Sequence, residues 1–163
     1  MDIQPSSLYA ARFKALRRVS GQLRGRLTRH QETDTPEPPE TLNLLIVDDE
    51  QSICSTLKEY FSHVGFGVDT AIEISDAERL IATGKYEVLI QDIRMGSAKD
   101  LGGIQVIKFA RTHRPAMRIV VLTAHGTHEV ENEARVLGVD AFLSKPQPLS
   151  QLAQVVRTLV ATG

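Results

Sequence analysis

The chain of 163 residues contains a single cysteine, Cys54, and lacks several features that mark whole classes of protein. One cysteine cannot form an intramolecular disulfide, and no Cys/His cluster has the spacing of a zinc site. No apolar run approaches the roughly 20 residues that a transmembrane helix needs. The N-terminus has no apolar core of a signal peptide, because charged residues interrupt its apolar ones. We therefore expect a protein of the reducing cytoplasm.

Charge is distributed unevenly along the chain, although the net charge is only −1. Residues 3–30 carry seven Lys or Arg residues and no acid, whereas residues 31–40, QETDTPEPPE, carry four acids and no Lys or Arg. The three prolines of the second stretch favour an extended spacer. The sequence therefore predicts a basic amphipathic tail (1–30), an acidic proline-rich linker (31–41) and a main domain (42–163).

The basic tail has apolar residues at helical spacing from Tyr9 to Leu27, although Gly21 and Gly25 weaken a helix there. The alternative is a tail that is partly disordered in isolation. A basic segment such as residues 8–30 can contact an anionic membrane surface, nucleic acid, an acidic protein surface or a second copy of itself. It resembles no DNA-binding fold. These alternatives stay open, as does the oligomeric state.

The main domain alternates short apolar segments with segments of helical periodicity. Strands are predicted within 42–47, 65–72, 87–90, 117–122 and 140–143, and helices at 50–63, 74–83, 104–113, 127–138 and 149–161. Strands that are apolar on both sides and separated by helices imply a parallel sheet covered on both faces. The predicted fold class is therefore α/β, with a doubly wound sheet.

Polar residues that could bind a ligand or take part in catalysis follow four of the predicted strands. They are Asp48 and Asp49 after the first strand, Asp92 after the third, Thr123 at the end of the fourth and Lys145 after the fifth. Each of them alone is most often a turn, a cap or a surface residue. Because ligands of such sheets bind at the carboxyl ends of the strands, the set together indicates a functional site.

The chemistry of this set is specific. Clustered carboxylates repel one another, and a hard cation such as Mg2+ relieves that repulsion through oxygen ligands. A carboxylate can also act as a nucleophile and form an acyl phosphate. Phosphoryl transfer chiefly needs charge neutralisation and in-line positioning, which the cation, the Lys145 ammonium group and the Thr123 hydroxyl can supply. The sequence therefore predicts Mg2+-dependent phosphoryl chemistry at this sheet edge.

Four motifs make residues 42–161 resemble a response-regulator receiver domain of two-component signalling. They are LLIVDDE (44–50), EVLIQDIRM (87–95), VVLTAHG (120–126) and DAFLSKP (140–146). The resemblance implies a flavodoxin-like fold of five helices and a five-stranded parallel sheet in the order 2-1-3-4-5. It also implies a phosphoprotein that accepts phosphoryl groups from a histidine kinase or a phosphotransfer protein and is not a turnover enzyme.

The resemblance assigns a role to each matching position. Asp92 resembles the phospho-acceptor, Thr123 the hydroxyl that moves to bind the phosphoryl group, and Lys145 the lysine that pairs with it. Asp49, Asp92 and the backbone carbonyl of Arg94 resemble direct Mg2+ ligands, and Asp48 resembles a ligand that acts through water. Phe142 resembles the aromatic switch, with an ordinary core aromatic as the alternative. The bond before Pro146 is typically cis in the family.

The sequence departs from the family pattern after the third predicted strand. Gly96 stands where a proline commonly follows the methionine, and the loop GSAKDLGG is about three residues longer than usual. Arg94 and His125 border the expected site at variable positions. We interpret them as residues that tune the lifetime of the phosphate, with solvated loop side chains as the alternative.

Two other functions fit parts of the pattern. A small phosphatase or phosphotransferase with an Asp nucleophile also places an acid after a strand, but a second Asp two residues after Asp92 is missing, because Arg94 stands there. A pseudo-receiver that serves only as a binding module would not need the retained acids, Thr123 and Lys145. No output domain is recognisable up to residue 163. The expected output is therefore a change of protein–protein contact, as in single-domain receivers, or one transmitted through the basic tail.

Overall fold

The computed structural model describes residues 41–96, 102–124 and 126–162. The predicted tail, nearly all of the predicted linker, most of the GSAKDLGG loop and His125 lie outside the described residues. The division into tail, linker and main domain therefore stays a prediction. The described residues belong to one compact unit.

Five strands alternate with five helices along this unit. They are β1 (Asn43–Val47), α1 (Gln51–His63), β2 (Gly67–Ala71), α2 (Ile74–Thr83), β3 (Val88–Gln91), α3 (Gly102–His113), β4 (Arg118–Thr123), α4 (His128–Val136), β5 (Ala141–Ser144) and α5 (Leu149–Ala161). Every predicted element is present. The bounds differ by a few residues, because β3 runs on through Gln91 and α3 begins at Gly102, two residues earlier than its periodicity predicts.

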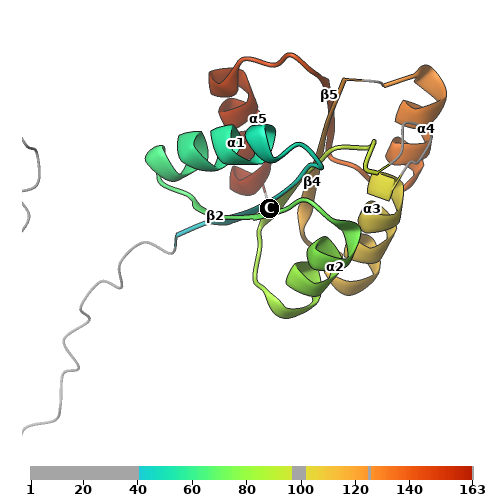
Figure 1. Cartoon of the computed structure of the whole chain (residues 1–163), viewed down its shortest axis with the longest axis horizontal. Helices are drawn as coiled ribbons and strands as arrows, with labels where there is room; N and C mark the ends of the chain where they lie inside the picture. Colours follow the sequence, from blue (N-terminus) through green and yellow to red (C-terminus); the bar gives the residue numbers. More distant parts are fainter. Residues whose placement is uncertain (1–40, 97–101, 125, 163) are drawn as a thin grey trace, which may run out of the picture. The chain divides into compact units, whose positions relative to one another are not determined.

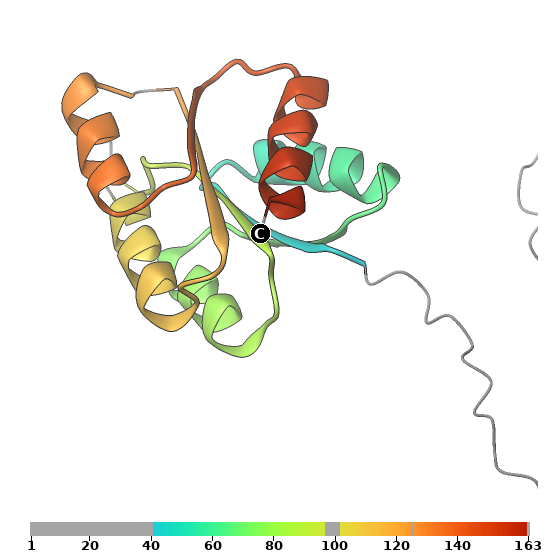
Figure 2. The same cartoon turned by 180° about the vertical axis from the view of Figure 1, so that it is seen from behind.

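The five strands form one parallel sheet in the order β2-β1-β3-β4-β5, which confirms the order that the resemblance implies. Helices α1 and α5 lie on one face of the sheet, and α2, α3 and α4 lie on the other (Figure 1, Figure 2). The order changes direction between β1 and β3, where β1 lies next to both β2 and β3. Ligand sites of doubly wound sheets form outside the carboxyl ends of the strands at such a point.

The alternation of side chains along the strands explains why β1, β3 and β4 are largely apolar. In β1, Leu44 and Ile46 belong to the core cluster beneath α1 and α5, whereas Leu45 and Val47 belong to the cluster beneath α2, α3 and α4. A strand that is covered on both faces must be apolar on both. The fifth strand differs, because β5 lies at the edge of the sheet and its residues are half-buried or exposed.

A cluster of charged residues fixes the amino ends of β4 and β5. The Asp140 carboxylate accepts hydrogen bonds from Arg111 Nη2 at 2.9 Å, from Arg118 Nη1 at 3.1 Å and from the Ile119 backbone N–H at 2.8 Å. Burial raises the pKa of Asp140, but these hydrogen bonds outweigh it and the pKa lies below its ordinary value. This carboxylate therefore joins the two strands whose opposite ends carry Thr123 and Lys145.

Among the described residues, none of the helices combines the length and the apolar character that a bilayer-spanning helix requires.

Candidate functional site

The backbone register of β1 and β3 brings the predicted carboxylates together. Val47 pairs with Gln91, so Asp48 and Asp92 each follow the last residue of neighbouring strands at the same level. The Asp92 N–H donates to Val47 O at 2.9 Å, and the Asp48 N–H donates to Ala71 O at 3.2 Å. The hydrogen-bond ladder of the sheet therefore extends to both acids and fixes their backbones.

Three carboxylates converge at this edge of the sheet. Oxygen atoms of Asp48, Asp49 and Asp92 all lie within 4.8 Å of one another. Asp48 is 3% exposed and Asp92 is 8% exposed, whereas Asp49 faces solvent. The Lys145 ammonium group lies between two of them, with Nζ 2.5 Å from Asp48 Oδ2 and 3.3 Å from Asp92 Oδ2. The structure thus brings together the acids and the lysine that the sequence singled out.

Burial controls the electrostatics of the pair formed by Asp48 and Lys145. Burial raises the pKa of Asp48 above 3.8, although hydrogen bonds from Lys145 and from the Glu50 N–H, 3.0 Å from Oδ1, oppose that rise. Burial alone would lower the pKa of Lys145, but its hydrogen bond to Asp48 and the nearby acids outweigh that effect and raise the pKa. Lys145 is therefore cationic across the physiological range.

The donor set fits a hard divalent cation. Carboxylate oxygens are the ligands that Mg2+ prefers, together with water and phosphate oxygens, and the exposed side of Asp49 leaves room for those. The loop after β3 runs beside the acids. The Arg94 N–H donates to Asp92 Oδ1 at 3.4 Å, and the Gly96 N–H donates to Asp49 Oδ2 at 3.3 Å. Residues 94–96 thus lie at the cluster, where the resemblance places the Arg94 carbonyl.

Thr123 and Phe142 lie on the neighbouring strands. Thr123 is the last residue of β4 and is fully buried, and its carbonyl accepts the Lys145 N–H at 2.9 Å. Phe142 on β5 pairs with Val121, is half-buried and packs against the core cluster beneath α2, α3 and α4. Its ring lies against Gly126, since a Cβ atom added there would be 2.7 Å from Phe142 Cε1. The Lys145–Pro146 bond is cis, as the resemblance implies.

Two residues at the site were not identified from the sequence. Gly103 packs so closely on the strand end that an added Cβ atom would lie 2.1 Å from the Asp92 carbonyl oxygen. Gln91 is fully buried, and its Nε2 donates to that same oxygen at 2.6 Å. The sequence signal for Gly103 was a pair of glycines at the start of a helix, and the signal for Gln91 was a polar residue at the end of a buried strand.

Comparison with known proteins identifies the family to which this chain belongs. Residues 44–157 match the family model of the response regulator receiver domain. The chain belongs to this family. Its relatives include the transcriptional regulatory protein CusR of Escherichia coli K12, 34% identical over 122 residues, and the alginate biosynthesis regulator AlgB of Pseudomonas aeruginosa, 31% identical over 109 residues.

The receiver domain accounts for only part of those relatives. The match covers 75% of this chain but 52% of CusR, and 67% of this chain but 24% of AlgB. Solved structures match over most of their own length. A CheY-like receiver domain protein from Methanospirillum hungatei has a TM-score of 0.70 at 22% identity, with 76% of this chain and 99% of that chain covered. The response regulator TrrA from Thermotoga maritima, solved in complex with Mg2+ and BeF, has a TM-score of 0.65 at 27% identity, with 73% and 99% covered.

Membership of the family carries general properties. Receiver domains are signalling modules that interact with histidine kinases or phosphotransfer proteins and with output domains. Phosphorylation and Mg2+ binding at an acidic pocket are typical of them. The expected fold and family are therefore confirmed, and the roles of individual residues stay predictions.

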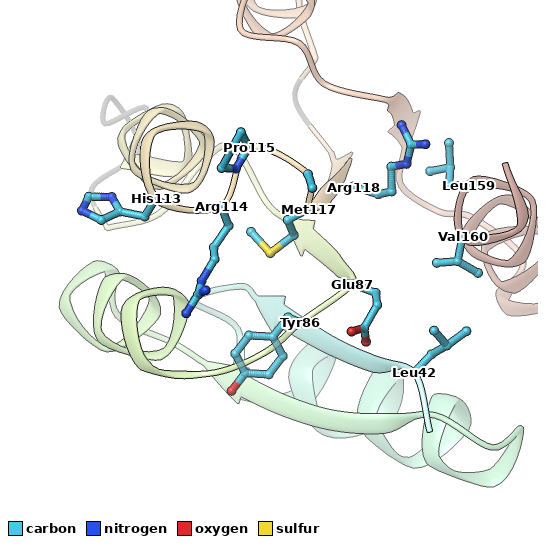
Figure 3. Close-up of a pocket in the computed structure, with 11 residues that line it drawn as sticks. Leu42, Tyr86, Glu87, His113, Arg114, Pro115, Met117, Arg118, Leu159 and Val160 are labelled. Atoms are coloured by element: carbon cyan, nitrogen blue, oxygen red, sulfur yellow. The ribbon is translucent and has the colours of Figure 1, made fainter. Parts of the chain in front are cut away.

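A cavity of about 500 Å3 lies near the amino ends of the strands, opposite the ends that carry the carboxylates (Figure 3). Its walls include Leu42, Glu87 and Arg118, which lie just before or at the amino ends of β1, β3 and β4. Arg114 points across it toward the end of α2, where its guanidinium group donates to the carbonyls of residues 81, 82 and 84 (Figure 3). The phosphoryl chemistry expected at the carboxyl ends does not involve this cavity.

Proposed function

We propose that the chain is a cytoplasmic phospho-accepting receiver in which Asp92 takes a phosphoryl group from the phosphohistidine of a histidine kinase or phosphotransfer protein. The observation that carries this proposal is the cluster of three carboxylates within 4.8 Å, with Lys145 between Asp48 and Asp92. The same groups that repel one another in the absence of a cation are suited to hold Mg2+ and a phosphoryl group together.

In the proposed step, an oxygen of the Asp92 carboxylate attacks phosphorus while the phosphorus–nitrogen bond of phosphohistidine breaks. An acyl phosphate forms, and the electron pair of the broken bond stays on the imidazole. Bound Mg2+ supplies charge neutralisation for the phosphoryl oxygens; Asp49, Asp92 and the Arg94 carbonyl would hold it directly and Asp48 through water. Lys145 pairs with a phosphoryl oxygen, and the Thr123 hydroxyl donates to another. Gain of this group is a signalling event and not turnover.

The switch involves the strands that carry Thr123 and Phe142. Thr123 ends β4, and Phe142 pairs with Val121 two residues before it, so a movement of Thr123 is transmitted to packing around the ring. The new charge biases the domain toward a state in which the face formed by α4, β5 and α5 is packed differently. An output partner then binds the two states with different affinity. In wild-type protein treated with beryllofluoride, the Phe142 ring resonances should shift, and unchanged resonances would contradict this role.

Two side chains bordering the site, Arg94 and His125, are proposed to set the lifetime of the acyl phosphate. Arg94 is half-buried beside Asp92, and His125 lies outside the described residues. Replacement of each by alanine should change the rate of autodephosphorylation. Equal rates in wild type and variant would remove that residue from the proposal.

The basic segment 8–30 also lies outside the described residues, and its contact with a membrane surface or nucleic acid stays a prediction. Binding of the full chain to anionic vesicles or to duplex DNA, compared at low and high salt, tests each surface separately. A chain lacking residues 1–30 is the matched control. Binding that persists without this segment would contradict its role.

One experiment separates the receiver from its two rivals. Wild-type protein, Asp92→Asn and the exposed-site control Asp76→Asn are each incubated with Mg2+ and acetyl phosphate. A receiver and its Asp76 control gain one labile phosphoryl group, and Asp92→Asn gains none. A pseudo-receiver gains none in any form, whereas a phosphatase releases phosphate over many turnovers without accumulating a labile phosphoryl group, and Asp92→Asn abolishes that release.

A further inference from the structure

Gln91 is the only polar residue of β3, and it is fully buried. Its strand neighbours are valine, leucine and isoleucine, and Leu89 on the same face belongs to the apolar cluster beneath α2, α3 and α4. The amide Nε2 donates to the Asp92 carbonyl at 2.6 Å and contacts Met95 Sδ at 3.1 Å. The amide oxygen Oε1 is buried and has no hydrogen-bond partner among the described residues.

These two contacts span the segment that borders the carboxylates. Within it, the Arg94 N–H faces Asp92 Oδ1 and the Gly96 N–H faces Asp49 Oδ2. The Gln91 side chain joins the two sides of this turn from within, because it contacts Asp92 at one end and Met95 at the other. Its position is suited to hold the turn in the conformation that presents both N–H groups to the acids.

The turn is anchored at Ile93, whose carbonyl accepts the Gly103 N–H at 3.0 Å, whereas Gly96 adds no rigidity to the far end of the turn. Gly96 has a φ of 92°, a conformation that glycine adopts easily and that proline cannot. The Gln91 side chain contacts Met95 from within the turn and so restrains this end of it.

Fold stability does not account for an amide at this position. A buried acceptor without a partner is unfavourable, and an apolar side chain of similar size would suit the surrounding cluster better. Because the amide adds no favourable packing of its own, its replacement by methionine should leave the domain as stable as the wild type or more stable. The amide is explained by what its Nε2 holds in place.

We propose that Gln91 is a positioning residue that holds residues 92–96 in the geometry required for Mg2+ binding and phosphoryl transfer. This inference rests on the proposed function of Asp92. Gln91 itself contacts neither the cation nor the phosphoryl group; it acts through the Asp92 backbone and through Met95. Loss of its amide should loosen the turn while the sheet stays intact.

The test uses the full chain carrying Gln91→Met, with Leu89→Met as the matched control on the same strand and the same face. Hydrogen exchange of the Arg94 and Gly96 amides is measured by NMR without Mg2+ or phosphate. The Kd for Mg2+ is measured by titration calorimetry, and Tm is measured for all forms. In Gln91→Met we expect about tenfold faster exchange at the two amides and about tenfold weaker Mg2+ binding, with Tm equal or higher. In Leu89→Met the exchange rates and the Kd should equal those of wild type.

Unchanged exchange and unchanged Mg2+ affinity in Gln91→Met would overturn the proposal. A lower Tm with faster exchange throughout the sheet would also overturn it, because Gln91 would then support the core. If Gln91→Met does not fold, Gln91→Leu is measured in the same way, and failure of both variants to fold would likewise overturn the proposal. Absence of an acyl phosphate in wild-type protein would instead overturn the proposed function, since the exchange measurement needs neither Mg2+ nor phosphate.

Discussion

The close packing of Gly103 on the end of β3 yields a prediction whose size follows from the structure. A Cβ atom at Gly103 would lie 2.1 Å from the Asp92 carbonyl oxygen and 2.7 Å from Ile93 Cα, and Cβ contacts under 3.0 Å essentially never occur. Both neighbours are backbone atoms, so α3 or the end of β3 must move by about 0.9 Å or more to accommodate alanine. That movement displaces the proposed nucleophile, because Asp92 itself supplies the contact.

Two effects of Gly103→Ala should therefore appear together. Overpacking should lower the free energy of unfolding by about 1–3 kcal/mol, which for a domain of this size lowers Tm by roughly 3–10 °C. Misplacement by about 1 Å should slow phosphorylation by acetyl phosphate up to about 100-fold. Denaturant titration and the rate of acyl-phosphate formation measure the two effects.

The adjacent glycine provides the matched control. A Cβ atom at Gly102 would lie 2.6 Å from Ile74 Cδ1, the mobile end of a side chain, and 3.2 Å from the Met95 carbonyl oxygen. Gly102→Ala should therefore cost less stability than Gly103→Ala and leave the phosphorylation rate near that of wild type. A Gly103→Ala protein as stable and as readily phosphorylated as wild type would show that this close contact positions nothing.

Charge at the site and a structural arginine give three further predictions. Lys145→Met removes the ammonium group between two acids, so without Mg2+ at about pH 7 the free energy of unfolding should fall by about 1–3 kcal/mol. Added Mg2+ should restore part of that loss in denaturant titrations, and no recovery would contradict a cation site. Burial raises the folded-state pKa of Asp48 above the 3.8 of the unfolded chain, so the folded state binds the carboxyl proton of Asp48 more tightly than the unfolded chain does. The contribution of Asp48 to stability therefore rises as pH falls through its folded-state pKa. Mg2+ competes with that proton, so the gain in Tm on adding Mg2+ should shrink as pH falls toward the folded-state pKa of Asp48, and a constant gain would argue against the raised pKa. Arg114→Met removes the hydrogen bonds to the carbonyls that end α2 and should lower the free energy of unfolding by about 1–2 kcal/mol, with Asp92 phosphorylated at the wild-type rate.

Local patterns in the sequence were sufficient for the doubly wound α/β class and for the acids of the site, whereas the strand order came from the resemblance to receiver domains. Apolar strands that alternate with helical segments predict a parallel sheet, and the carboxyl ends of parallel strands share one edge. Asp48, Asp92 and Lys145 follow their strands directly, so their convergence follows from topology. The side chains of β1 alternate between the two core clusters on opposite faces of the sheet, which explains why a strand covered on both faces is a continuous apolar run.

Other features depend on contacts between distant segments and were not predictable from local pattern. Gly103 looks like a poor helix residue until α3 is packed against the carbonyl of Asp92. Gln91 looks like the polar end of a strand until its burial and its contact with Met95 are known. The join between Arg111, Arg118 and Asp140 connects residues up to 29 positions apart in the sequence. Such contacts are set by how helices pack on the sheet, which periodicity does not specify.

Locating the phosphoryl group on the chain is the decisive experiment for the proposed function. The chain of residues 1–163 is treated with acetyl phosphate in the presence of Mg2+ or of a chelator, and its peptides are mapped by mass spectrometry after the acyl phosphate is trapped. We expect a modification of Asp92 that requires Mg2+ and is absent from the chelated sample. A wild-type chain that acquires no phosphoryl group, or that acquires it on another residue with Asp92 unmodified, would contradict the assignment of Asp92 as the phospho-acceptor.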